Sequence, residues 1–238
     1  MPHVEAGASV DLLLERTVES GMALVAAAGL VALASVLHRG SWRLLRNVVT
    51  IVHEGGHAIV ALLTGRRLAG IRLHSDTSGV TVSVGRPRGP GMIATLVAGY
   101  PAPSLLGLLA AYLVTNGMTR GLLIGSVVVL AAMLLAIRNP FGVLSVLLTG
   151  AVIFLVAWFA AVEVQEAFGL LFAWFLLFAG VRPVRELGRM RNRPDTRDSD
   201  AHQLARLTAA GPLMWIVVFL LINLSALVVG GGLLLGLL

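Results

Sequence analysis

The sequence predicts an all-α polytopic membrane protein of about six to seven transmembrane helices, with a short β-hairpin after the second helix. Of the 238 residues, 57% are apolar and only 13% are charged, whereas a soluble domain carries about 25% charged residues. The apolar residues form long runs separated by short charged patches, and most runs approach the roughly 20 residues that cross a bilayer. We therefore expect one membrane-embedded domain over residues 1–238.

The apolar runs give the expected helices in chain order. They are Gly21–Leu37, Arg43–Leu63, Gly91–Thr115, Arg120–Ile137, Phe141–Val162, Ala167–Val181 and Leu213–Leu237. The first run follows a mildly acidic stretch without a cationic start, so we expect no cleaved signal peptide. The third run contains Gly99, Pro101 and Pro103, and we expect a kink or a break there.

Two segments between the runs are too polar to span a membrane. The segment Leu68–Gly85 contains a turn signal at Ser75–Gly79, followed by valines that alternate with Thr81 and Ser83, and this pattern predicts a β-hairpin. The segment Arg182–Gly211 carries seven arginines and four acidic residues. We expect it to be the one substantial loop outside the membrane.

The charges indicate how the chain lies in its membrane. The net charge is +6, and the chain has neither lysine nor cysteine. The arginines flank apolar runs, which is typical of topology signals and not of a nucleic-acid surface, so we expect the lipid bilayer and no nucleic acid as a partner. Their distribution favours the N-terminus, the hairpin and Arg182–Gly211 in the cytoplasm. This orientation places Arg39, Arg43 and Arg46 on the outer side of the membrane, where the positive-inside rule does not favour arginines. The Ala-, Gly- and Arg-rich composition suggests a bacterial plasma membrane.

One expected helix contains a metal-binding pattern, the string HEGGH at residues 53–57. Residues four apart lie on one helix face, so His53 and His57 can bind one zinc ion. Glu54 then lies beside the open zinc position and can act as the base for a bound water. Ionisable groups at membrane depth are expected to be functional, although polar residues that hydrogen-bond between helices are the alternative. The two glycines make room for a substrate strand or for a neighbouring helix.

A zinc site of this type needs a third protein ligand. No Asp, Glu, His or Cys lies between Asp76 and Glu163, so three of the expected helices cannot supply one. The remaining candidates are His74, Asp76, Asp195, Asp198, Asp200 and His202. We prefer Asp200, then His202, then Asp76. Asp200 can equally be a helix cap, because Ser199 and Asp200 precede an amphipathic run, and Asp76 is a typical turn residue.

These strings resemble the site-2 protease family of intramembrane zinc metalloproteases, in particular its compact bacterial B-like branch. The matching strings are VHEGGHAIVALLTG at Val52–Gly65, IRLHSDTSGVT at Ile71–Thr81, GYPAPS at Gly99–Ser104 and SDA at Ser199–Ala201. The likeness extends from about Arg43 to Trp215. The resemblance implies zinc ligands at His53 and His57, a catalytic base at Glu54 and a membrane-associated sheet near the active site.

The chain departs from this family at one position. Typical members carry the third ligand as the Asp of an N-P-D-G or L-D-G motif on a later helix. Here the similar string is NPFG, with Phe141 in place of that Asp. This departure strengthens the preference for Asp200. It also leaves open an enzyme of altered activity.

The function we predict is hydrolysis of membrane-protein substrates by a zinc endopeptidase whose active site opens toward the cytoplasm. The substrate segment must unwind, because a helix holds its own peptide groups in hydrogen bonds, and we expect it to pair with the hairpin edge at Val80–Val84. Asn139 either donates a further hydrogen bond to the substrate or joins two helices. The alternatives are a non-proteolytic zinc protein that binds client membrane proteins, and a transporter that uses the same residues as a relay.

Overall fold

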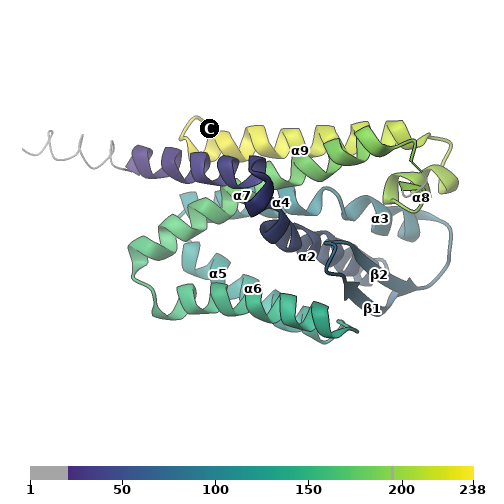
Figure 1. Cartoon of the computed structure of the whole chain (residues 1–238), viewed down its shortest axis with the longest axis horizontal. Helices are drawn as coiled ribbons and strands as arrows, with labels where there is room; N and C mark the ends of the chain where they lie inside the picture. Colours follow the sequence, from purple (N-terminus) through teal and green to yellow (C-terminus); the bar gives the residue numbers. More distant parts are fainter. Residues whose placement is uncertain (1–20, 194–195) are drawn as a thin grey trace, which may run out of the picture.

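The computed structural model describes residues 21–193 and 196–238 and confirms a helical fold with one hairpin. A helix over Gly21–Leu37 comes first. It is followed by α2 (Arg39–Leu63), β1 (Arg67–Leu73), β2 (Gly79–Val84), α3 (Pro90–Ala98), α4 (Ala102–Thr115), α5 (Thr119–Leu134), α6 (Pro140–Phe159), α7 (Val162–Met190), α8 (Asp200–Leu207) and α9 (Pro212–Leu234). In Figure 1 the first helix and α9 lie along one side of the molecule, α5 and α6 lie along the other, and α2 and α7 run between them.

The described helices supply fewer spans than the sequence predicted. By length and composition, α6, α7 and α9 can each cross a membrane. Two bent pairs raise the number to five: Gly21–Leu37 with α2, bent by 98°, and α3 with α4, bent by 67°. The prediction of six to seven counted the first two helices separately and included α5, which has only 16 residues.

The expected break in the third apolar run lies between α3 and α4. The first of these helices ends at Ala98, and the second begins at Ala102, next to Pro101, which has no N–H to continue the helix. The side chain of Asn223 on α9 is fully buried, and its Nδ2 donates a hydrogen bond to the carbonyl of Tyr100 at 3.3 Å. The neighbouring helix thus satisfies a backbone group that the break leaves free.

The segment Arg182–Gly211, expected to be a loop, is largely helical. The helix expected to end at Val181 continues to Met190 as part of α7, and α8 forms farther along. The continuation is amphipathic: Val184 and Leu187 are buried, while Arg182 and Glu186 form an ion pair at 2.9 Å. Charge content alone therefore misplaced the end of this helix, because its apolar face still packs against α8 and α9.

The predicted hairpin is present as an antiparallel pair of strands. The outer edge of β1 is also covered, because Ile71 exchanges backbone hydrogen bonds with Ala136 (2.8 Å) and Arg138 (2.9 Å). The side-chain amide of Asn139 adds two bonds to the backbone of Leu73, at 3.2 Å and 2.7 Å. Asn139 thus joins the start of α6 to β1, which agrees better with the expected role in joining two helices than with substrate binding. The outer edge of β2 has no such partner among the described residues.

The segment that contains α8 is fixed by a small apolar cluster. Ala201 and Leu204 are fully buried and pack with Phe219 of α9 and with the end of α7. This packing holds the beginning of α8 against α2 and α3. Figure 1 shows α8 and the hairpin at the same end of the molecule.

Candidate metal centre

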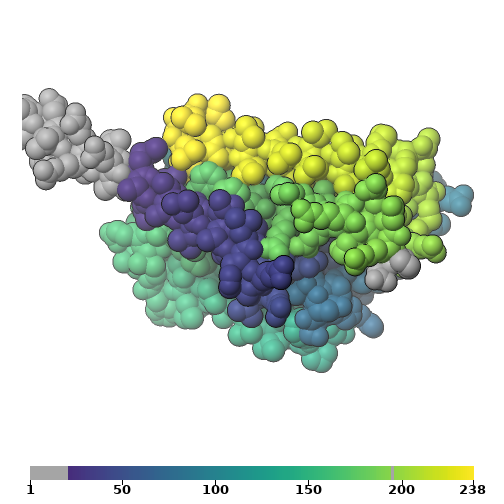
Figure 2. All heavy atoms as spheres, turned by 45° about the horizontal axis from the view of Figure 1, so that its top comes forward, coloured from purple at the N-terminus to yellow at the C-terminus, as the bar shows by residue number. Residues whose placement is uncertain are grey.

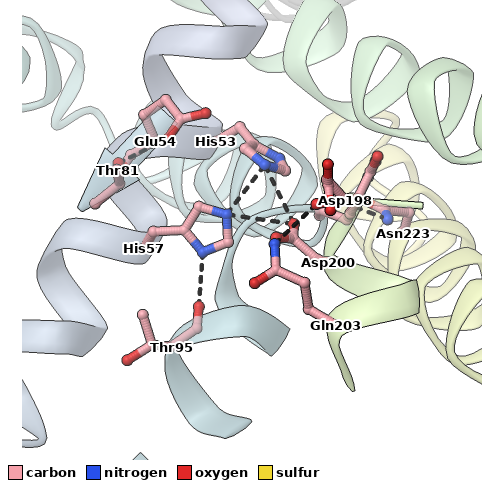
Figure 3. Close-up of polar contacts among 10 residues, drawn as sticks. His53, Glu54, His57, Thr81, Thr95, Asp198, Asp200, Gln203 and Asn223 are labelled. Atoms are coloured by element: carbon pink, nitrogen blue, oxygen red, sulfur yellow. Dashed lines mark hydrogen bonds and ion pairs between the residues drawn. The ribbon is translucent and has the colours of Figure 1, made fainter. Parts of the chain in front are cut away.

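Two histidines of α2 point the same ring atom toward each other. The Nε2 atoms of His53 and His57 lie 3.1 Å apart, as the i, i+4 spacing predicts (Figure 3). The Nδ1 of His57 lies 2.7 Å from the carbonyl oxygen of Thr95 on α3. A carbonyl only accepts hydrogen bonds, so this Nδ1 carries a proton, which leaves Nε2 as the ring atom of His57 that can bind a metal.

A carboxylate from α8 completes a triangle with these imidazoles. The Oδ2 of Asp200 lies 3.3 Å from the Nε2 of His53 and 3.3 Å from the Nε2 of His57. Asp200 is 8% exposed, and its Oδ2 has no hydrogen-bond donor within the described part of the chain. Burial opposes its ionisation, but the two imidazoles hold the pKa of Asp200 well below its usual range. Asp200 is therefore a carboxylate.

The triangle has the dimensions of a zinc site. Tetrahedral zinc with bonds of about 2.0 Å separates its ligand atoms by about 3.3 Å. The three candidate ligand atoms are 3.1 to 3.3 Å apart, and among the described residues they form the group that could hold a metal ion. Two imidazole nitrogens and one carboxylate oxygen are also a donor set that zinc accepts, with a fourth position left for water.

Glu54 lies on the hairpin side of the two histidines. Its side chain is 3% exposed, and Thr81 of β2 donates a hydrogen bond to its Oε2 at 2.6 Å (Figure 3). A Cβ at Gly79 would lie 2.5 Å from the other carboxylate oxygen, so the hairpin needs a glycine there to make room for Glu54. The hairpin therefore both orients and encloses this carboxylate.

A cavity of about 450 Å³ joins these groups. The histidines, Glu54 and Asp200 line it together with residues 79–83 of β2, so the free strand edge forms one wall. Tyr100 lies at the α3–α4 break and places its ring against His53, with ring centroids 4.9 Å apart. The cavity thus brings a possible metal site, an acidic side chain and an unpaired strand edge into one space.

None of the other described candidates for the third ligand belongs to the group of three that could hold a metal ion, although Asp198 lines the same cavity. Asp76 is at the hairpin turn, where hydrogen bonds from the hydroxyl and the backbone N–H of Ser78 lower its pKa. The ring of His202 contacts the hydroxyl of Ser199 at 2.9 Å. Phe141 belongs to an apolar cluster at the start of α6. Asp195 lies outside the described residues.

Three residues of the site could not be found from the sequence. Thr95 orients His57, Thr81 orients Glu54, and Gly99 gives the two imidazoles room. Threonines are common in membrane helices and strands, so neither threonine carried a signal. Gly99 was noted as part of a helix break and of the string GYPAPS, but neither observation placed it beside the imidazoles.

The two glycines of the HEGGH string serve different neighbours. A Cβ at Gly56 would lie 2.6 Å from the Cβ of Ala102, which shows that this glycine permits close helix packing. A Cβ at Gly55 would meet no atom within 4 Å. Gly55 faces a separate apolar cavity of about 440 Å³ between α2, α4, α5 and α6.

Comparison with known protein families identifies a related family. A family model described as Peptidase M50B-like matches residues 26–230, which is most of the chain. No curated protein and no solved structure matches it. The family match confirms the resemblance to site-2 proteases that the sequence strings indicated.

Proposed function

The chain belongs to the Peptidase M50B-like family, and from this we propose that it is an intramembrane zinc metalloendopeptidase that cleaves membrane-protein substrates within or near the bilayer. The family implies a metalloprotease, and the apolar helices indicate an integral membrane protein. The observation that carries the proposal is the convergence of His53, His57 and Asp200 beside Glu54 in one cavity.

In this proposal the three converging side chains hold zinc and Glu54 is the catalytic base. When bound, zinc polarises the scissile carbonyl and lowers the pKa of water. Glu54 accepts the proton of the attacking water and delivers it to the leaving amine. The hydroxyl of Thr81 keeps the carboxylate of Glu54 in place, and the carbonyl of Thr95 keeps the ring of His57 in the tautomer that binds metal.

The outer edge of β2 is the proposed substrate-binding strand. A peptide can be cleaved only when it is extended, because a helix holds its peptide groups in hydrogen bonds. The edge of β2 lines the cavity, whereas residues 136–139 cover the edge of β1. A substrate strand paired with β2 would lie beside Glu54, in the usual mode of strand addition.

We also propose that the site opens to the cytoplasmic side of a bacterial plasma membrane. Three arginines lay on the outer side, against the positive-inside rule, when each helix was counted as a separate span: Arg39, Arg43 and Arg46. In the structure they line one cavity with Arg182 and Arg189. Both groups of arginines can therefore lie on the same side, which supports the positive-inside assignment.

Zinc content and cleavage test the proposal together. Purified wild-type protein should contain about one zinc ion per chain. Glu54→Gln should keep the zinc, and His53→Ala and Asp200→Ala should lose it. Glu163→Gln, an exposed acid at the first turn of α7, is the matched control and should change neither property.

Cleavage is measured as new termini in co-reconstituted membrane proteins, identified by mass spectrometry. Wild type and Glu163→Gln should produce such termini, and Glu54→Gln should not. Cleavage that survives Glu54→Gln would refute the mechanism. Zinc without cleavage by the wild type would favour the alternative function, a zinc protein that binds client membrane proteins without cutting them.

A further inference from the structure

A third cavity, which we call the arginine pocket, lies where the first helix meets α2 and α7. Its volume is about 420 Å³. Five arginines line it: Arg39, Arg43 and Arg46 from α2, and Arg182 and Arg189 from α7. We propose that the arginine pocket binds the phosphate group of an anionic ligand, from a phospholipid headgroup or from free phosphate. This site is independent of the metal centre and of the proposed proteolysis.

Part of the pocket is rigidly built. The guanidinium of Arg182 donates hydrogen bonds to the carbonyl of Val36 and, at 2.9 Å, to Glu186. It also lies over the ring of Trp42, 4.4 Å from the centroid. These three contacts fix its position, and they join the end of the first helix, the beginning of α2 and α7 at one point. Such a cation is pre-organised and does not lose side-chain freedom on binding.

The pocket has more positive charge than its own residues neutralise. Five arginines face one acid, Glu186, which is already shared by Arg182 and by Arg46 at 3.4 Å. Arg39, Arg43 and Arg189 are exposed and have no carboxylate within 4.0 Å in residues 21–193 and 196–238. Positive charges in one cavity repel each other, and a bound anion would reduce that repulsion.

One further feature of the pocket suits an anion. The 25-residue helix α2 begins here, and the N-terminus of a helix carries a partial positive charge. The pocket therefore combines the positive end of α2 with its excess cations.

Phosphate is the anion whose chemistry fits this arrangement. Arginine guanidinium groups bind phosphate oxygens with two parallel hydrogen bonds, and several arginines can share one group. The pocket lies at the bend between an apolar helix and α2, beside a tryptophan, a residue common at membrane interfaces. Figure 2 shows the beginning of α2 on an open face of the molecule next to α7. A headgroup could enter from that face.

The test compares the double variant Arg43→Gln/Arg189→Gln with Arg88→Gln/Arg185→Gln. All four residues are exposed, and each variant loses two positive charges, but neither Arg88 nor Arg185 lines the pocket. Native mass spectrometry would count phosphatidylglycerol and phosphatidylcholine molecules retained by each protein. Each arginine at an anionic lipid changes binding by about fivefold, so we expect about thirtyfold weaker retention of phosphatidylglycerol in the pocket variant only.

A competition with inorganic phosphate distinguishes the sources of the ligand. Displacement of the bound phosphatidylglycerol would show that the pocket accepts free phosphate, and retention would assign it to the lipid. Equal unfolding temperatures in phosphatidylcholine nanodiscs would show that both double variants are folded. Equal retention of phosphatidylglycerol and phosphatidylcholine by the wild type, or an equal loss in both double variants, would overturn the proposal. Glu54→Gln should bind as the wild type does, whether or not the chain is a protease.

Discussion

Replacing Gly99 by alanine tests the geometry of the metal centre with one methyl group. A Cβ at this position would lie 2.5 Å from the Cε1 of His57 and 2.7 Å from the Cε1 of His53. The backbone there has φ −62° and ψ −65°, which alanine adopts without strain. The effect of the substitution therefore comes from contact with the two imidazoles.

The size of the effect follows from those distances. Carbon atoms are in favourable contact at about 3.5 to 4.0 Å, so the rings or α3 must move by about 1 Å. His57 cannot move freely, because its Nδ1 is bonded to the carbonyl of Thr95 at 2.7 Å. Disturbing such a supporting contact weakens metal binding by about 10- to 100-fold. A misplacement of about 1 Å slows catalysis by about 100-fold.

Zinc affinity and cleavage are measured side by side for Gly99→Ala and for Gly55→Ala. The second variant adds the same methyl group to α2, where no atom lies within 4 Å of the new Cβ. We expect Gly55→Ala to bind zinc and to cleave as the wild type does. If Gly99→Ala also kept full zinc affinity and full activity, the conclusion that α3 leaves no room for a methyl group beside the imidazoles would be refuted.

Three further variants separate catalysis, hairpin stability and metal binding. Thr81→Val removes the 2.6 Å hydrogen bond to Glu54, so kcat should fall by about tenfold while zinc content stays unchanged; unchanged kcat would show that the bond does not orient the base. Asn139→Ala removes both hydrogen bonds to the backbone of Leu73 and should lower the free energy of unfolding by about 1 to 3 kcal/mol. Thermal unfolding measures this loss, and the zinc content of the folded protein should not change. His202→Ala should retain zinc, because its ring contacts Ser199 and is not part of the metal-binding group; loss of zinc would return it to the list of ligands.

The parts of the site that depend on local geometry could be predicted from the sequence. Residues four apart on a helix share a face, so the string HEGGH was enough to bring His53 and His57 together. Asp200 lies beside them, and its segment was expected to supply the third ligand because other segments lack suitable side chains. Three expected helices contain no acid or histidine, so the third side chain had to come from a polar segment.

The parts that depend on packing between distant segments could not be predicted. Thr95 and Gly99 reach the imidazoles only because α3 packs closely on α2 at Gly56. Gly40 and Ser41 indicate a break between the first helix and α2, but they do not predict its angle of 98°. That bend brings Arg39 and Arg43 close to α7, where they line one cavity with Arg182 and Arg189.

The two faces of α2 explain how ionisable groups are tolerated among apolar helices. One face carries His53, Glu54 and His57 into a cavity walled by the hairpin and α8, whereas Gly55 and Ile59 on the other face line an apolar cavity. An isolated charge among lipid-facing helices is costly, and a polar wall lowers that cost. Because α3 to α6 contain no acid, the carboxylate that faces the two histidines comes from α8, which is not among the candidate spans. Folding of α8 onto α2 therefore both completes the candidate metal site and makes its charges stable.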